Sequence, residues 1–224
     1  RLLVGASVAG AAERLDVHLP SYARTVRPDS AQPPEGSALA MGPQRENYAL
    51  AAAYWQDEYF PMETLEETAR HFTPPRHRLR QVAEIEGVTF WNDSKATNAH
   101  ASLAALASFG GEVVWIGGGK SKGGNLADFT SEAAPCMHAA VLLGETGPKL
   151  RDLLAAEGVN CQTCGSVEEA VEQALATAKA GQAVVFSPAF ASFDMFASYA
   201  ARGECFEHAV AACKERLLQG QQSE

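Results

Sequence analysis

The chain has 224 residues, which is enough for one large domain or for two domains, one of them small or partial. Hydrophobic residues make up 46% and charged residues 20%, the composition of an ordinary soluble globular protein. The net charge of -9 argues against a general nucleic-acid binder, which needs a basic face. No apolar run approaches the roughly 18 residues of a membrane span, so no span is expected.

Cysteine usage points to a reducing compartment. The five cysteines are an odd number without a paired framework, so we expect free thiols in the cytoplasm. The pair Cys161-x-x-Cys164 leaves open a redox site or half of a zinc site, but no second pair completes the latter. Residues 1–7 are too short an apolar stretch for a signal peptide, and charged residues follow soon after. Since there is no initiator Met, the numbering is expected to start inside a longer protein.

The first part of the chain predicts two short strands, a loop and two helices. The strands are expected at residues 4–8 and 16–19, and the proline-rich text at 28–36 is typical of a loop. Apolar spacing then predicts helices over residues 46–59 and 62–72. The text that follows, Thr-Pro-Pro-Arg-His-Arg, is a stiff polar connector. We therefore place a domain boundary here, between residues 1–73 and 74–224, with the two prolines as a candidate hinge.

After this connector, strands and helices alternate. Two continuous apolar runs, residues 113–116 and 184–186, are typical of strands covered on both faces. The alternation predicts an α/β domain with a Rossmann-like, doubly wound, mostly parallel sheet. Its first two strands, joined around Glu86-Gly87, are expected to form an antiparallel hairpin. The expected strands are 80–85, 88–91, 112–116, 139–143, 159–163 and 183–186, and the expected helices are 98–109, 127–133, 148–157, 166–180 and 194–218.

The most informative stretch is residues 91–98, Trp-Asn-Asp-Ser-Lys-Ala-Thr-Asn. It lies where a predicted strand leads into a predicted helix, and ligands of α/β sheets bind at that edge. Asp93 and Lys95 place opposite charges on this turn, and Thr97 or Asn98 can cap the helix, whose free N–H groups face an anion. We interpret the stretch as a binding site rather than a plain capped turn.

Three further loops follow predicted strands and are expected at the same edge, namely residues 117–125, 143–147 and 187–194. In the first, Gly119-Lys120-Ser121 lacks the spacing of a Walker A motif, because Val114 stands where that motif has a glycine. What remains is a glycine-rich turn that lets the backbone approach a ligand, with Lys120 and Lys122 as charges. A flexible, solvated loop is the alternative.

The loop at 187–194 puts Ser192 just before Asp194, at an expected helix start. Its two aromatic residues, Phe190 and Phe193, predict either a pocket wall or a plug of the core. Its serines lack the G-x-S-x-G setting, so a serine hydrolase is not indicated. His100, near the first loop, is expected on the surface of a helix.

Together these loops resemble the Mur ligases that add D-glutamate to a peptidoglycan precursor. The resemblance covers roughly residues 40–220, and sister ligases and folylpolyglutamate synthases carry different text at residues 92–98. The matching text is Phe-Trp-Asn-Asp-Ser-Lys-Ala-Thr-Asn at 90–98, Gly-Gly-x-x-Lys ending at Lys122, Ser-Pro-Ala-x-Ala-Ser-Phe-Asp-x-Phe at 187–196, and Arg202-Gly203-x-x-Phe206.

The resemblance implies a three-domain, ATP-dependent ligase of which residues 1–73 are the tail of the central α/β ATPase domain. Residues 74–224 would be the C-terminal domain that receives the amino acid. The substrates implied are UDP-N-acetylmuramoyl-L-alanine and D-glutamate, joined through an acyl phosphate in the cytoplasm by a monomer. ATP and Mg²⁺ are implied, but the Walker A loop and the main metal-binding residues would lie upstream of Arg1. No metal site is therefore expected in this chain, which alone is expected to be inactive.

Residue roles are also carried over from the resemblance. The matches to positions that contact ATP are Asn47, Arg78 and Asp93. Lys95 matches a catalytic position, and the matches to D-glutamate-binding positions are Thr97, Lys122, Ser192, Phe193 and Tyr199. Phe193 and Tyr199 are aromatic variants. The chain also departs from the family at the start of the helix that carries Asn47, where Pro43 replaces His and Gln44 replaces Asn.

Two other classes of function are weighed against the ligase. A non-catalytic ligand-binding module is the main alternative, because the chain contains no P-loop. A dinucleotide-binding oxidoreductase domain is disfavoured, since no glycine fingerprint followed by an acidic strand end is present.

Overall fold

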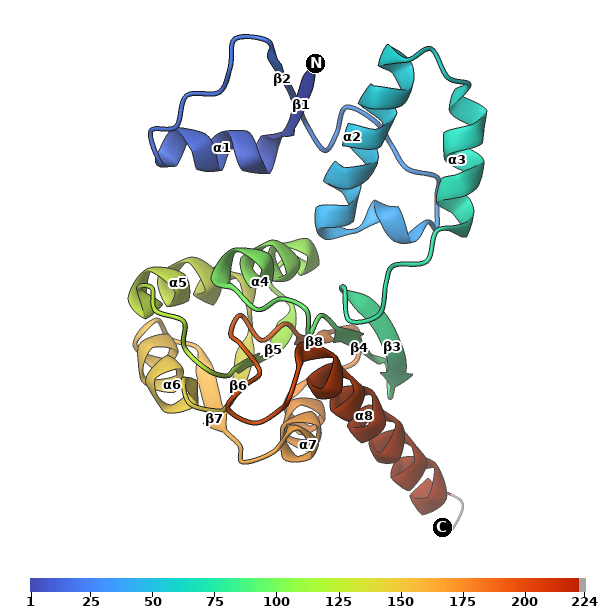
Figure 1. Cartoon of the computed structure of the whole chain (residues 1–224). Helices are drawn as coiled ribbons and strands as arrows, with labels where there is room; N and C mark the ends of the chain where they lie inside the picture. Colours follow the sequence, from blue (N-terminus) through green and yellow to red (C-terminus); the bar gives the residue numbers. More distant parts are fainter. Residues whose placement is uncertain (222–224) are drawn as a thin grey trace. The chain divides into compact units, whose positions relative to one another are not determined.

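The computed structural model describes residues 1–221 and separates into two compact units, Arg1–Pro74 and Pro75–Glu224 (Figure 1). In unit 1, strand β1 (Leu2–Gly5) leads through helix α1 (Ala6–Arg14) to strand β2 (Ala23–Val26), which pairs with β1 in parallel. The predicted strand at 4–8 therefore overlaps β1 only at Val4 and Gly5, and the predicted strand at 16–19 is wrong. The alanine-rich text after Gly5 favours a helix, since alanine has the highest helix propensity.

Two further helices complete unit 1, α2 (Gly42–Asp57) and α3 (Met62–His71), after a short 3-10 helix, η1 (Ala38–Ala40). Helix α2 begins four residues before the predicted start at Glu46, because Pro43 occupies its first turn, where a fixed φ and a missing N–H are tolerated. Its buried face packs Tyr48 and Ala52 against Ala69 of α3. The two predicted helices thus form the small core of this unit.

Unit 2 contains a six-stranded sheet in the order β3-β4-β8-β5-β6-β7. The first pair is the expected antiparallel hairpin, with Ile85 opposite Val88, and the other neighbours are parallel. The last strand of the chain, β8, inserts between β4 and β5, a feature that strand–helix alternation does not reveal. The bounds are β3 (Arg80–Ile85), β4 (Val88–Asn92), β5 (Val113–Gly118), β6 (Ala139–Leu143), β7 (Asn160–Thr163) and β8 (Ala183–Phe186).

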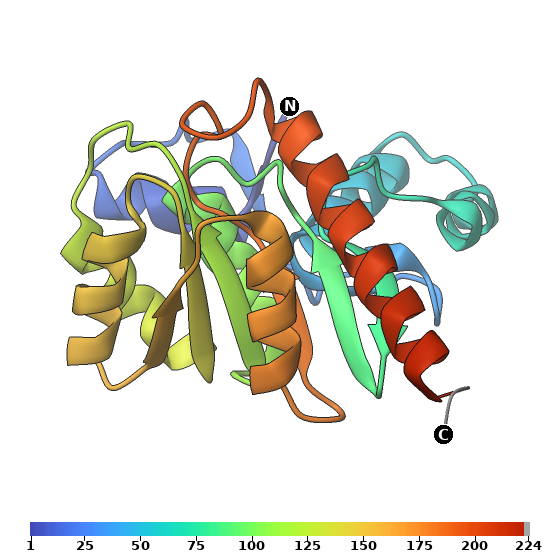
Figure 2. The ribbon, with the colours of Figure 1, turned by 90° about the horizontal axis from the view of Figure 1, so that it is seen from below.

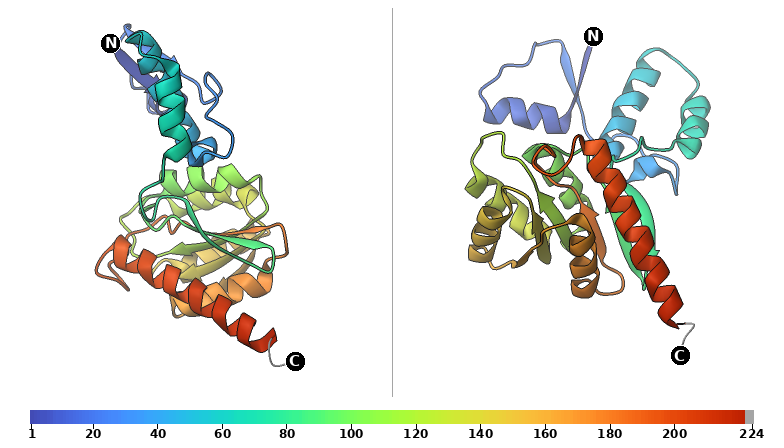
Figure 3. Two further views of the ribbon diagram at one scale, coloured as in Figure 1. Left: turned by 90° about the vertical axis from the view of Figure 1, so that its right-hand side faces the viewer. Right: turned by 60° about the horizontal axis from the view of Figure 1, so that its bottom comes forward.

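Helices cover both faces of this sheet, as the continuous apolar strands predict. Along β5, Val114 and Ile116 pack toward α7 and α8, whereas Val113 and Trp115 pack toward α4, α5 and α6. Helices α7 and α8 cross one face in Figure 2, and the left view of Figure 3 shows the sheet between the two helical layers. The helices are α4 (Ala99–Leu106), α5 (Leu126–Ala133), α6 (Gly147–Ala156), α7 (Val167–Thr177) and α8 (Tyr199–Gln221), with 3-10 turns η2 (Ala107–Phe109) and η3 (Ala134–Cys136).

The start of α8 differs from the prediction. The helix expected from Asp194 begins at Tyr199, because Ser198 accepts a hydrogen bond of 3.1 Å from the Ala201 amide, the pattern of a helix cap. The carboxylate of Asp194 instead accepts the amide N–H of Glu145 at 2.9 Å. Among residues 1–221, no helix combines the length and the apolar character needed to cross a membrane, α8 included.

Candidate active site

The four loops singled out from the sequence meet at the carboxyl ends of β4, β5, β6 and β8. The loop after β8 is hydrogen-bonded to the loop after β5 through Lys120 and Ala191, whose amides and carbonyls pair at 2.8 and 3.2 Å. It is also bonded to the loop after β4, because the Ala189 amide donates to the Ala96 carbonyl at 3.0 Å. The expected gathering of these loops is therefore observed, and the insertion of β8 between β4 and β5 is its cause.

The loop after β6 is held by Thr146. Its hydroxyl accepts the Gly119 amide at 3.1 Å and donates to the Gly119 carbonyl at 3.0 Å. Gly119 has φ of +141°, and a side chain there would meet the Ala191 carbonyl oxygen at 2.4 Å. Glycine is required at this position because the backbones of the loops approach one another so closely.

Asn92 ends β4 and is fully buried. Its side-chain oxygen accepts the Ser94 amide at 3.1 Å, and its NH2 group faces His77 Nδ1, the Gly203 carbonyl and Glu207 Oε1, each at 3.0 Å. These contacts join the connector after Pro75 and helix α8 to the start of the loop. Asn92 was part of the stretch singled out in the sequence, but its structural role was not predicted.

Asp93 is 8% exposed, and both of its carboxylate oxygens have protein donors. The Leu79 amide donates to Oδ1 at 3.1 Å, and the Ser187 hydroxyl donates to Oδ2 at 2.7 Å. Burial raises the pKa of this carboxyl to about 6, although the two hydrogen bonds and the charge of Arg78 act in the opposite direction. Asp93 therefore organises the loop, and each oxygen keeps a lone pair for a further donor.

Lys95 and Tyr199 lie together at the surface of this edge. The ammonium of Lys95 lies 5.5 Å from the centre of the Tyr199 ring, within the range of a cation–π contact. The ring of Tyr199, at the start of α8, also contacts the edge of His77, with centroids 6.5 Å apart. The two predicted site residues are thus brought together from positions more than a hundred residues apart.

A second pairing of predicted residues joins the loops after β4 and β5. The ammonium of Lys122 donates to the Thr97 carbonyl at 3.4 Å. Lys122 is exposed and Thr97 is half-buried, so both remain accessible to a ligand. Asn98 rather than Thr97 caps α4, with its side chain accepting the Ala101 amide at 2.9 Å. His100 is exposed on α4, as expected.

Some of the predicted residues in the loop after β8 are buried in the core, and one is exposed at the surface. Phe190 is 7% exposed and packs edge-on against Phe129, so it is a plug of the core. Phe193 is 66% exposed. Ser192 is 2% exposed, and its carbonyl accepts the amides of Met195 and Phe196 in the turn before α8.

The residues expected to contact ATP belong to both units. Arg78 is exposed in the connector that leads to Leu79 and Asp93. Asn47 belongs to unit 1, where it is exposed on α2 and donates to the Gln44 side chain at 3.1 Å. No group of three or more metal-ligating side chains is found in the described part of the chain.

Sequence reasoning did not predict the structural role of the buried polar residues beneath the loops, chiefly Ser94, Ser187, Thr146 and Arg202. Ser94, Ser187 and Thr146 are all at most 4% exposed, and each hydroxyl is hydrogen-bonded. Ser187 had a signal in the sequence, because it directly follows the apolar run 184–186, which indicates a buried strand end but not its partner.

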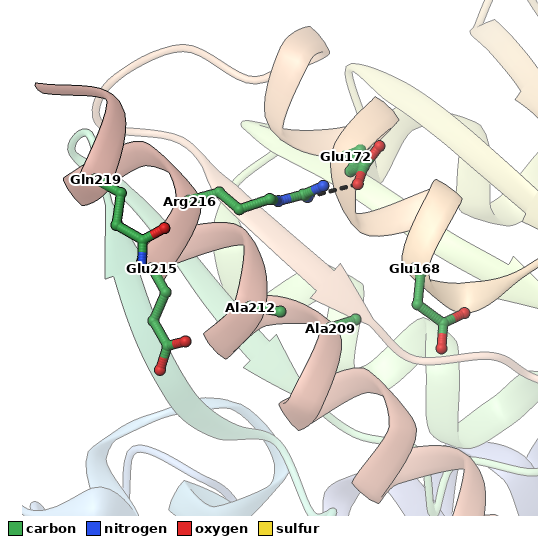
Figure 4. Close-up of a pocket in the computed structure, with 7 residues that line it drawn as sticks. All are labelled: Glu168, Glu172, Ala209, Ala212, Glu215, Arg216 and Gln219. Carbon is green, nitrogen blue, oxygen red and sulfur yellow. Dashed lines mark hydrogen bonds and ion pairs between the residues drawn. The ribbon is translucent and has the colours of Figure 1, made fainter. Parts of the chain in front are cut away.

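A groove away from these loops lies between α7 and α8 and has a volume of about 300 Å³ (Figure 4). It holds none of the predicted site residues, and an ion pair between Arg216 and Glu172 crosses it. It is lined by Glu168, Glu172, Ala209, Ala212, Glu215, Arg216 and Gln219.

All five cysteines are free, as expected. Burial raises the pKa of Cys161 and of Cys164 to about 11, which disfavours the thiolate that redox chemistry and metal binding use.

Comparison with known proteins identifies relatives of the chain. Residues 77–190 match the family described as Mur ligase, glutamate ligase domain. Relatives named UDP-N-acetylmuramoylalanine--D-glutamate ligase include that of Streptomyces avermitilis, 38% identical over 170 residues, which are 72% of this chain and 36% of the relative. That of Ralstonia nicotianae is 40% identical over 68% of this chain and 30% of the relative, and that of Frankia casuarinae is 43% identical over 63% and 30%. The chain thus spans about a third of the length of these relatives.

Solved structures share the fold at low sequence identity. MurF ligase from Thermotoga maritima in complex with ADP has a TM-score of 0.58 at 15% identity, covering 94% of this chain and 54% of that one. Folylpolyglutamate synthase of Mycobacterium tuberculosis, complexed with ADP and AMPPCP, has a TM-score of 0.54 at 15% identity, covering 88% and 50%. At these identities the similarity shows a common fold and nothing more.

Proposed function

The chain belongs to the Mur ligase family, whose glutamate ligase domain it matches at residues 77–190, and on this premise we propose that the complete protein joins D-glutamate to UDP-N-acetylmuramoyl-L-alanine. The observation that supports this most directly is that Lys95, Thr97 and Lys122 lie at the carboxyl ends of β4 and β5, the two strands that flank β8, and that Lys122 contacts the Thr97 carbonyl. Two ammonium groups at one loop edge suit a dianionic amino acid and a phosphorylated carboxylate. The names of the relatives support the choice of D-glutamate.

The reaction proposed is amide formation driven by ATP. The carboxylate of the nucleotide substrate takes the terminal phosphoryl group of ATP, leaving ADP. The amine of D-glutamate attacks the acyl carbon of this acyl phosphate, the bond from that carbon to the phosphate oxygen breaks, and the amine releases a proton. Negative charge is concentrated on the transferring phosphoryl group and the departing ADP in the first step, and on the acyl oxygen of the tetrahedral intermediate in the second, so fixed positive groups accelerate both.

Each residue has a distinct part in this proposal. Lys95 stabilises the charge that develops at the acyl centre. Lys122 pairs with the side-chain carboxylate of D-glutamate, next to its contact with the Thr97 carbonyl. Thr97 and Ser192 donate hydroxyl hydrogen bonds to the amino acid. Phe193 and Tyr199 are proposed as apolar walls against which the methylene groups of D-glutamate pack.

ATP is assigned to Asn47, Arg78 and Asp93. The carboxylate of Asp93 fits a ribose hydroxyl, because within residues 1–221 each of its oxygens has one protein donor and can accept a second hydrogen bond. Arg78, exposed beside it, suits a nucleotide by charge and by stacking. Mg²⁺ would accompany the phosphates, and we assign no ligand for it to this chain.

In this proposal, residues 1–73 are the tail of a central ATPase domain and residues 74–224 are the domain that receives the amino acid. The reaction would serve peptidoglycan precursor synthesis in the cytoplasm, and the enzyme would act as a monomer. The chain alone would be inactive, since no P-loop is present in it.

The test is an ADP-formation assay on the complete protein that contains this chain. ADP is expected only when UDP-N-acetylmuramoyl-L-alanine and D-glutamate are both supplied, and L-glutamate, L-lysine and L-alanine are the matched controls. Better turnover with any control amino acid would reject the assignment of D-glutamate. Substrate binding without ADP formation would favour the non-catalytic binding module.

A further inference from the structure

Helix α8 places one arginine beneath the loops of the candidate site. Arg202 is 3% exposed, although an arginine side chain is almost never fully buried unless it is paired. Its Nε donates to the Ser94 hydroxyl at 3.1 Å, and one terminal nitrogen donates to the Ser94 carbonyl at 3.0 Å. The other terminal nitrogen donates to the Phe190 carbonyl at 3.1 Å. One guanidinium therefore joins the loop after β4 to the loop after β8.

The same group also abuts the loop after β5. A Cβ at Gly119 would lie 3.2 Å from a terminal nitrogen of Arg202, after the Ala191 carbonyl oxygen the nearest atom, so the guanidinium lies against this glycine. The Ser94 hydroxyl in turn donates to the Tyr199 carbonyl at 2.8 Å, which fixes the first turn of α8 to the same loop. Three loops and a helix start thus converge on one buried group.

Arg202 makes no ion pair within the part of the chain that the structure describes. Asp194 acts on it only through longer-range attraction. Burial lowers the pKa of this arginine to about 10, which leaves it charged at neutral pH. A buried charge held only by neutral oxygens is costly to retain, and a charge fixed under a loop attracts an anion bound above it. A purely structural cross-link between the loops does not require that charge.

We propose that Arg202 is a positioning residue of the amide-forming site: it fixes Ser94 and Phe190 relative to each other, so that Lys95 faces the acyl centre while Ser192 faces the amino acid that attacks it. The identity of the ligand in this proposal rests on the function proposed above, whereas the geometry of the contacts does not. Lys95 directly follows Ser94, and Ser192 follows Phe190 by two residues. A shift at either anchor therefore moves a predicted ligand-binding side chain, and displacements of about 1 Å at such positions cost about 100-fold in rate.

The kinetic test uses the complete protein and three variants, Arg202→Gln, Arg202→Lys and Ser94→Ala. Arg202→Gln is expected to lower kcat by about 100-fold and to raise the KM for D-glutamate by about 10-fold, with the KM for ATP within about 2-fold. Arg202→Lys, which keeps the charge but not the planar fork, is expected to recover about 10-fold of kcat/KM. Ser94→Ala, which keeps the guanidinium and its other acceptors, is expected to lower kcat/KM for D-glutamate by about 5-fold. Arg216→Gln, exposed on the same helix, is the control and should leave all constants unchanged.

Amide hydrogen exchange separates a failure of this inference from a failure of the proposed function, because it needs no substrate. In Arg202→Gln, exchange should rise at residues 93–98 and 188–194 and stay unchanged at residues 139–143 of β6. A uniform rise in amide exchange, or no rise, would overturn the positioning role. Equal changes in the KM for D-glutamate and the KM for ATP in Arg202→Gln would also overturn it, as would kinetics of Ser94→Ala that match those of the parent. If Arg202→Gln does not fold, Ser94→Ala decides by the same two measurements. If the parent protein has no ligase activity but Arg202→Gln shows the local rise in amide exchange, only the proposed substrate is rejected.

Discussion

The hydroxyl of Ser187 donates a hydrogen bond of 2.7 Å to Oδ2 of Asp93, and this contact joins the ends of β8 and β4 across 94 positions of the sequence. Both residues are buried, so the pair ties together the two loops that carry most of the predicted D-glutamate contacts. The pair also makes this edge of the sheet sensitive to pH, because burial raises the pKa of Asp93 to about 6.

Stability should depend on pH through Asp93. Burial raises its pKa from an ordinary 3.8 to about 6, so the folded state favours the protonated carboxyl. The stabilising contribution is fully present below pH 3.8 and is lost as the pH rises through the folded pKa near 6. In denaturant titrations, the free energy of unfolding of the parent relative to Asp93→Asn should fall by about 3 kcal/mol between about pH 4 and about pH 7.

Ser187→Ala is the companion variant for this pH dependence. It removes a donor to the ionised carboxylate, so the pKa of Asp93 should rise further and the loss of stability should move to higher pH. If the difference in the free energy of unfolding between the parent and Asp93→Asn does not change with pH, Asp93 keeps an ordinary pKa in the folded protein.

Gly119 should tolerate no side chain. In Gly119→Ala, φ of +141° and the contact of the new Cβ with the Ala191 carbonyl oxygen act together, so we expect a loss of about 3 kcal/mol or more in the free energy of unfolding. Gly110→Ala is the matched control: φ there is +66° and no atom would lie within 4 Å of the added methyl group, so about 1 kcal/mol is expected. If chemical denaturation gives equal losses in the free energy of unfolding for Gly119→Ala and Gly110→Ala, the close approach of the loops is contradicted.

Lys122 should select for the second carboxylate of the amino acid. Replacing it with alanine removes a charge-assisted contact of about 1.5–3 kcal/mol, so the KM for D-glutamate should rise by at least about 10-fold while the KM for ATP is unchanged. Lys214→Ala, an exposed lysine on α8, is the control for the loss of one positive charge. Steady-state kinetics of the complete protein give both values. An unaltered KM for D-glutamate would remove Lys122 from the site.

The ring of Tyr199 should matter more than its hydroxyl. Tyr199→Phe keeps an aromatic face 5.5 Å from the Lys95 ammonium, whereas Tyr199→Leu removes it. A cation–π contact at an exposed site contributes about 0.5–1 kcal/mol, so kcat should fall by about 2-fold to 5-fold in Tyr199→Leu and stay near the parent value in Tyr199→Phe. The reverse order would show that the phenol, not the ring, acts on the substrate.

Local sequence patterns predicted much of unit 2. Continuous apolar runs such as residues 113–116 indicated strands covered on both faces, and alternate residues of β5 do face the two helical layers. The predictions failed where tertiary contacts outweigh local signals. Asp194 resembles a helix cap in the sequence, but its carboxylate is used by the Glu145 amide and α8 begins at Tyr199.

The sequence by itself determined that the loops after the strands gather at one edge, because a parallel sheet brings the carboxyl ends of its strands together, and it predicted the site there. It also supplied the residues of the predicted site. Only the tertiary structure decided which of them meet, because the order of strands depends on which surfaces pack together, and hydrophobic periodicity does not encode that order. Arg202 shows the difference: its contact with Ser94 spans 108 positions and exists only because β8 lies between β4 and β5 and leads into α8.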